Sequence, residues 1–112
     1  MDLMRVLVLN YEYPPLGGGA ANALFHIVRE FARNGEPVVD VVTSAPDGVF
    51  ATERLSKNVT VHKLPVRKEQ IHYWKQSEIL DYSRQGLRYA RHLTGERDYH
   101  LCHAFFALPK KA

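Results

Sequence analysis

The stretch RVLVLNYEYPPLGGGA, residues 5–20, determines the fold that the sequence predicts. Its apolar run over 6–9 is continuous, which favours a strand buried on both faces of a parallel sheet. Two prolines and three glycines then indicate a loop of about nine residues. From Ala20 the apolar residues recur at helical spacing until Asn34 and Gly35, where glycine accepts the left-handed conformation that ends a helix. The sequence therefore opens with a strand, a glycine-rich loop and a helix.

The rest of the chain continues the alternation of strands and helices. Strands are predicted over 38–43, 59–64 and 101–106, a helix over 77–93, and a polar connection over 44–57. This order predicts an α/β fold, Rossmann-like, with a mainly parallel sheet of about four strands and flanking helices. Because only two helices accompany the strands, we expect residues 1–112 to form a single partial domain that is truncated relative to a complete sheet.

The composition is that of an ordinary globular protein. Of 112 residues, 46% are hydrophobic and 24% charged, which excludes a disordered, collagenous or coiled-coil chain. The single cysteine excludes an internal disulfide. A net charge of +3 does not indicate nucleic acid as a partner. The N-terminal apolar run is too short for a secretory signal or a membrane span, so we expect a cytoplasmic protein.

The glycines at 17–19 are the strongest indication of a binding site. They permit close backbone approach to a ligand, and the amides at the start of the following helix favour an anion. A P-loop would need Lys after the glycines, where Ala20 stands. A dinucleotide fingerprint would need a third glycine, where Asn22 stands, and an acid at the end of the second strand, where Thr43 and Ser44 stand. A nicotinamide site is therefore disfavoured and we predict no cofactor, while a merely connecting loop remains an alternative.

Residues 5–20, the helix ending in Arg33-Asn34-Gly35, and the segment YHLCHAFFALP at 99–109 carry a resemblance to a known family. Together they resemble the N-terminal part of family 4 glycosyltransferases of the GT-B fold. The resemblance implies transfer of a sugar from a nucleotide-sugar donor to an acceptor. It places Gly17, Gly18 and Gly19 near the donor phosphates and the acceptor. It also implies a catalytic role for His103, which matches the first histidine of the family's fourth-strand motif.

Two positions depart from that motif, and one part of the family is missing from the sequence. His100 stands where the motif has Asp, and Phe105 replaces its second histidine. The family's C-terminal domain, with its nucleotide-sugar site and an E-x7-E motif, has no counterpart here. We therefore expect the chain alone to be inactive and to need a complementing C-terminal domain. The alternative is a non-catalytic module that binds a partner or forms a homodimer through an exposed edge around 101–108.

Two further patterns bear on partners. Five of the six histidines, His62, His72, His92, His100 and His103, show no spacing typical of metal ligands, so no metal site is predicted. Arg84, Arg88 and Arg91 share one face of the helix predicted over 77–93. That face is either a solvated surface or a contact for an anionic membrane surface, which would make the protein peripheral to the membrane.

Overall fold

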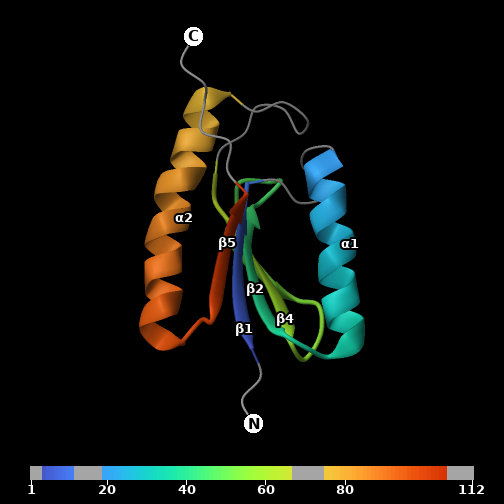
Figure 1. Ribbon diagram of the computed structural model, residues 1–112. Coiled ribbons are helices and arrows are strands. Elements are labelled where there is room, and N and C mark those ends of the chain that lie inside the picture. The colour runs from blue at the N-terminus through green and yellow to red at the C-terminus, as the bar shows by residue number, and fades with distance from the viewer. Residues whose placement is uncertain (1–3, 12–18, 67–74, 106–112) are drawn as a thin grey trace.

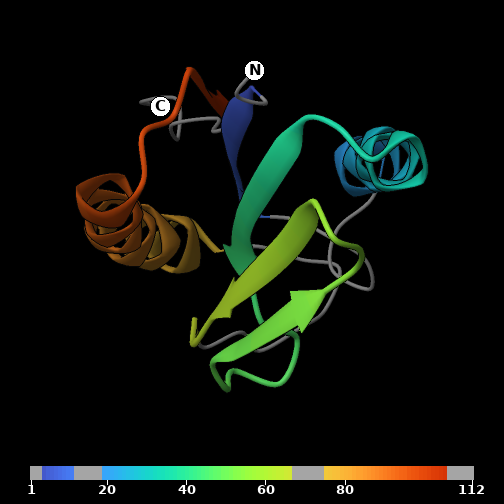
Figure 2. The same cartoon turned by 90° about the horizontal axis from the view of Figure 1, so that it is seen from below.

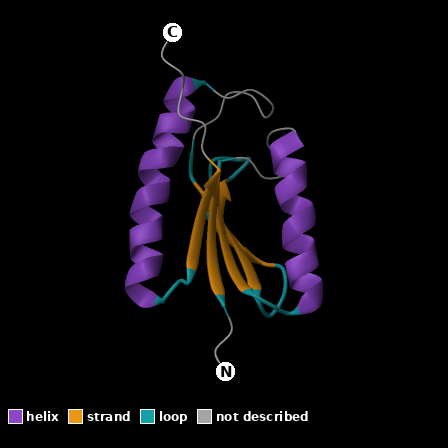
Figure 3. Ribbon diagram, in the orientation of Figure 1, coloured by secondary structure: helices purple, strands orange, loops and turns teal. Residues whose placement is uncertain are grey.

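The protein is a three-layer α/β structure. The computed structural model describes residues 4–11, 19–66 and 75–105. One sheet lies between helix α1 (Gly19–Asn34) and helix α2 (Gln76–Glu96), as Figures 1 and 3 show. Both helices begin at the edge where the parallel strands end and run back along the sheet (Figure 1).

The sheet is mixed, and its strand order creates a switch point. The five strands are β1 (Arg5–Asn10), β2 (Val38–Ser44), β3 (Ala51–Arg54), β4 (Val59–Leu64) and β5 (Leu101–Phe105). Their order across the sheet is β3-β4-β2-β1-β5, with β3 antiparallel to β4 and the other three pairs parallel (Figure 2). The chain thus builds from β1 outward through β2 to β4 and then returns to the other side of β1. In open α/β sheets, such a reversal is where ligands bind.

The prediction of about four strands and a polar connection over 44–57 was wrong in one respect. β3 lies inside that connection, and all four of its residues are exposed. Its composition, Ala-Thr-Glu-Arg, has no apolar alternation, so the hydrophobic pattern contained no signal for it. The strand forms through backbone pairing with β4 across a turn, where the Leu55 amide donates to the Val59 carbonyl at 3.0 Å.

The core consists of two apolar layers, one on each face of the sheet. Alternate residues of β1 serve both layers, which explains why its sequence is continuously apolar. Val6 and Val8 pack toward α1, with Leu24, Val28, Val39, Val41, Val59 and Val61. Leu7 and Leu9 pack toward α2, with Val42, Leu64, Val66, Tyr82, Ala90 and Leu93. The predicted burial of the first strand on both faces is confirmed.

The end of α1 also follows the prediction. Gly35 has φ +78°, the left-handed conformation that glycine accepts without strain. Its amide donates to the Phe31 carbonyl at 3.1 Å. Asn58 links the last turn of α1 to the residue before β2, because its side-chain amide donates to the carbonyls of Phe31 and Pro37, each at 2.8 Å.

Gly86, inside α2, offers a direct test of helix propensity. A Cβ at this position would lie 3.6 Å from two carbons of the Tyr82 ring, which is ordinary van der Waals contact. We therefore expect Gly86→Ala to raise the free energy of unfolding by up to about 1 kcal/mol, measured by urea denaturation. Gly48→Ala is the contrasting variant and should destabilise, because Gly48 has φ +72°. A loss of stability in Gly86→Ala would show that the α2 packing has no room for the methyl group.

Candidate functional site

The edge of the sheet at which the parallel strands end, called the carboxyl edge below, brings together the ends of the first and last predicted strands and the start of the first predicted helix. β1 ends at Asn10 and β5 at Phe105, and these two residues are register partners on either side of the switch point. α1 begins at Gly19 on the same edge (Figure 1). The unpaired amides and positive dipole of a helix N-terminus favour an anionic group at such a position.

Polar side chains are buried at this edge. Asn10, Thr43 and Ser44 are each at most 2% exposed and close the ends of β1 and β2. Within the described part of the chain, neither Thr43 Oγ1 nor Ser44 Oγ has a hydrogen-bond partner. Burying a hydroxyl without a partner is costly, so such groups are uncommon in folded proteins and concentrate where function needs them.

Tyr82 of α2 supports the same edge from the other face. Its side chain is fully buried, and its hydroxyl donates to the Val42 carbonyl at 2.6 Å. Burial raises the pKa of Tyr82, so the hydroxyl stays protonated and remains a donor. The contact fixes the first half of α2 against the end of β2, next to Ser44.

The structure places the predicted glycine and histidine residues as follows. Gly19 is the first residue of α1, whereas Gly17 and Gly18 lie outside the described residues. His103 is opposite Val8 on β5, two residues before the strand ends, and it is exposed. Its side chain lines a groove of about 230 Å³ on the α1 side of the sheet, together with Val6, Val8, Leu24, Ile27, Val28, Phe31 and Leu101. His103 thus shares a face of the sheet with the helix that begins at Gly19.

His100, one of the two positions that depart from the family motif, is at the opposite edge. Its Nδ1 accepts from the Arg5 amide at 2.9 Å, and its own amide donates to the Arg5 carbonyl at 2.9 Å. This pair of contacts aligns the start of β5 with the start of β1. The imidazole acts here as a surrogate for a backbone acceptor.

A buried polar network lies under the second half of α2, and the sequence pattern did not predict it. Asp40 of β2 is 2% exposed and His62 of β4 is 4% exposed. Asp40 Oδ1 lies 2.8 Å from His62 Nε2, and Asp40 Oδ2 accepts from Arg97 at 2.8 Å and from the Tyr99 hydroxyl at 2.6 Å. The Tyr89 hydroxyl lies 2.7 Å from His62 Nδ1. The network joins β2, β4, α2 and the segment that leads into β5.

The electrostatics of the network fix its protonation pattern. Burial on its own raises the pKa of Asp40, but hydrogen bonds from His62, Tyr99 and Arg97 outweigh it and hold that pKa at about 2. The ionised carboxylate only accepts hydrogen bonds, so His62 Nε2 carries a proton and donates it to Asp40, while His62 Nδ1 pairs with the Tyr89 hydroxyl. Burial and the charge of Asp40 raise the pKa of Tyr89, which keeps its hydroxyl protonated. The one sequence signal was an aspartate in the middle of an apolar strand.

The remaining predicted groups are at the surface or gather no ligand set. Arg84, Arg88 and Arg91 are all exposed on α2, and their contact with an anionic membrane stays a prediction. Within residues 4–11, 19–66 and 75–105, no group of three His, Cys, Asp or Glu side chains could hold a metal ion. Neither of the two described helices is both long enough and apolar enough to cross a membrane.

No family model matches the sequence, and no curated protein matches it at a significant level.

Proposed function

We propose that the chain is the Rossmann-like N-terminal part of a GT-B glycosyltransferase. In this proposal the carboxyl edge forms one wall of the cleft in which a sugar passes from a nucleotide-sugar donor to an acceptor. The observation that carries the proposal is the switch point between β1 and β5 with the N-terminus of α1 beside it. The resemblance of residues 5–20 and 99–109 to the family adds the chemical class of the substrate.

The chemistry of sugar transfer matches what this edge offers. The reaction leaves negative charge on the departing diphosphate, and preorganised donors near that charge stabilise the transition state. Amides at the start of α1 are donors of this kind. One wall does not exclude water, so a complementing C-terminal domain has to close the cleft and contribute the rest of the donor site.

Thr43 separates a binding role from a structural one. Thr43→Val keeps the shape of the side chain and removes a buried hydroxyl that has no described partner. We expect the free energy of unfolding to rise by about 1 kcal/mol. Affinity for a nucleotide sugar should stay unchanged, because the Thr43 side chain has no exposed surface with which to contact a ligand. Urea denaturation and calorimetric titration with UDP-glucose measure the two quantities. Stability and affinity that fall together would instead assign Thr43 to packing.

Melting experiments with a panel of nucleotide sugars test the function itself. UDP- and GDP-linked hexoses should raise the melting temperature of the protein progressively as their concentration increases, because a ligand that binds only the folded state stabilises it. Sulfate at matched ionic strength serves as the control for general anion effects. Equal shifts with sulfate and with every nucleotide sugar would contradict the proposal.

A second candidate function, a self-assembling module, is favoured by the surface next to β5. Leu101 is 52% exposed and Ile27 is 47% exposed, and both line the groove that contains His103. An apolar edge of this kind supports association with a second copy. Light scattering during gel filtration distinguishes the two functions. A concentration-dependent dimer that Leu101→Lys abolishes, with no response to nucleotide sugars, would support the module.

A further inference from the structure

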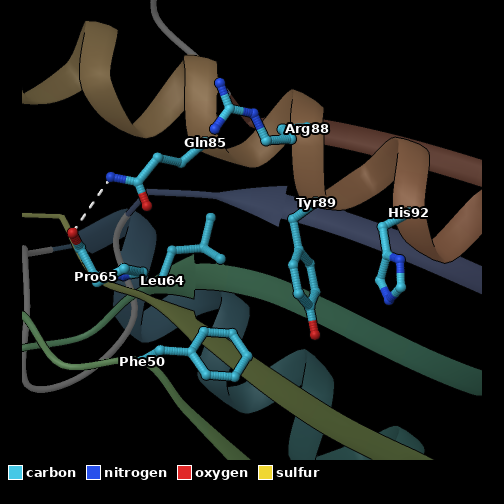
Figure 4. Close-up of a pocket in the computed structure, with 7 residues that line it drawn as sticks. All are labelled: Phe50, Leu64, Pro65, Gln85, Arg88, Tyr89 and His92. Carbon is cyan, nitrogen blue, oxygen red and sulfur yellow. Dashed lines mark hydrogen bonds between the residues drawn. The ribbon is translucent and has the colours of Figure 1, made fainter.

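A separate pocket lies between α2 and the outer strands. Its volume is about 290 Å³, and its lining comes from three elements (Figure 4). Gln85, Arg88, Tyr89 and His92 project from α2, Leu64 and Pro65 close the end of β4, and Phe50 precedes β3. The pocket lies on the α2 face beyond β4, whereas the switch point lies between β1 and β5.

Two aromatic rings form the main walls of this pocket. The Phe50 and Tyr89 ring centroids are 5.8 Å apart with an angle of 54° between the planes. Contacts with His62 fix the position of the Tyr89 ring. The Tyr89 hydroxyl lies 2.7 Å from His62 Nδ1, and the two ring centroids are 5.1 Å apart. Phe50 is 47% exposed, so its ring presents apolar surface that no described neighbour covers completely. At this centroid distance the two rings pack against each other, so together they present one apolar surface that suits the face of a flat ligand.

The polar groups of the pocket differ in how far they are already engaged. The Gln85 side-chain nitrogen donates to the Pro65 carbonyl at 3.3 Å and to Asp81 at 3.1 Å. His92 lies 3.1 Å from a Glu96 carboxylate oxygen. Arg88 is exposed, and the ion pairs formed among the described residues do not include it. The pocket therefore carries a cation that a ligand's negative group can pair with.

We propose that this pocket binds a small planar aromatic compound that carries a negative group. The ring lies against Phe50 and Tyr89, and the anionic group faces the guanidinium of Arg88. The volume of about 290 Å³ limits the ligand to one or two fused rings. This site is independent of the sugar-transfer proposal, and either can hold without the other.

Titration with 2-naphthoate, followed by ¹H–¹⁵N NMR, tests the site. We expect saturable shifts at the amides of Phe50, Leu64, Gln85 and Tyr89. Arg88→Gln should weaken naphthoate binding about fivefold and leave binding of the neutral analogue 2-naphthylmethanol unchanged. Arg84→Gln is the matched control, since Arg84 is on the same helix and does not line the pocket. Phe50→Ala should weaken both compounds.

Two results would overturn the proposal. One is equal naphthoate affinity in Arg88→Gln and Arg84→Gln, which would show that Arg88 forms no ion pair with the ligand. The other is a set of shifts centred on the groove at Leu101 and Ile27, which would assign the aromatic site to the opposite face. The substituted side chains are exposed, so the variants are expected to fold, and the dispersion of their NMR spectra verifies this.

Discussion

Replacing Asp40 by alanine is expected to lower the free energy of unfolding by about 3–5 kcal/mol. The substitution removes one carboxylate that accepts from His62, Arg97 and Tyr99 at 2.6–2.8 Å. It leaves buried donors without an acceptor, which is more costly than never burying them. Small domains are stable by only about 5–15 kcal/mol in total, so the variant should unfold at a much lower urea concentration.

Glu53→Ala is the matched control for this prediction. Glu53 also accepts from a cation, Lys63, at 3.0 Å, but its side chain is 51% exposed. Loss of an exposed ion pair costs about 1 kcal/mol or less. If both variants lose the same free energy of unfolding, the buried contacts of Asp40 contribute no more to stability than an exposed ion pair does.

The same network predicts how stability depends on pH. The folded-state pKa of Asp40 is about 2, below the ordinary value of an aspartate. Its contribution is therefore complete above the unfolded-state pKa of about 3.9 and is lost as the pH falls toward 2. Urea denaturation between pH 5 and pH 2 should show this loss in the wild-type protein. In Asp40→Ala the decline over this range should be smaller, because the group that titrates is gone.

Tyr82→Ala is expected to cost a similar amount, about 3–5 kcal/mol. Tyr82 is the largest fully buried side chain, and its ring packs in the layer between α2 and the sheet. Truncation leaves a cavity and also removes the hydrogen bond to the Val42 carbonyl. Because this contact lies close to Ser44, we expect Tyr82→Ala to disturb the structure of the carboxyl edge as well as to lower the free energy of unfolding of the protein.

Tyr82→Phe separates the two parts of this effect. It keeps the ring and removes only the hydroxyl, so we expect a loss of about 1 kcal/mol by urea denaturation. If Tyr82→Phe were as unstable as Tyr82→Ala, the hydrogen bond rather than the packing of the ring would hold α2 in place.

The elements that bury apolar surface could be predicted from the sequence, and the exposed ones could not. The strand at 59–64 and the end of α1 at Gly35 agree with the structure because periodicity and glycine conformation determine them locally. The exposed β3 depends on pairing with β4, a long-range partner that leaves no apolar pattern.

The candidate site was predictable to the same extent. The change of period predicts a helix start at Ala20, one residue after the observed start at Gly19. The apolar run predicts a strand end at Thr43, one residue before the observed end at Ser44. The network around Asp40 was not predictable, because Arg97 and Tyr99 are 57 and 59 residues away in the sequence. Only the folded topology places their side chains on the same carboxylate.

The most direct test of the proposed function is a ¹H–¹⁵N NMR titration of the protein with UDP-glucose and GDP-mannose. Saturable shifts are expected at the amides of Asn10, Gly19, Ala21 and Thr43, which line the carboxyl edge or begin α1. Amides of Val38 and Val59, which begin β2 and β4 at the opposite end of the strands, should stay unchanged. Binding should be weak, with a Kd of about 1 mM, because one wall of a cleft buries little of the ligand. The proposed sugar-transfer function is contradicted if neither compound shifts these four amides, or if the shifts are found at another surface.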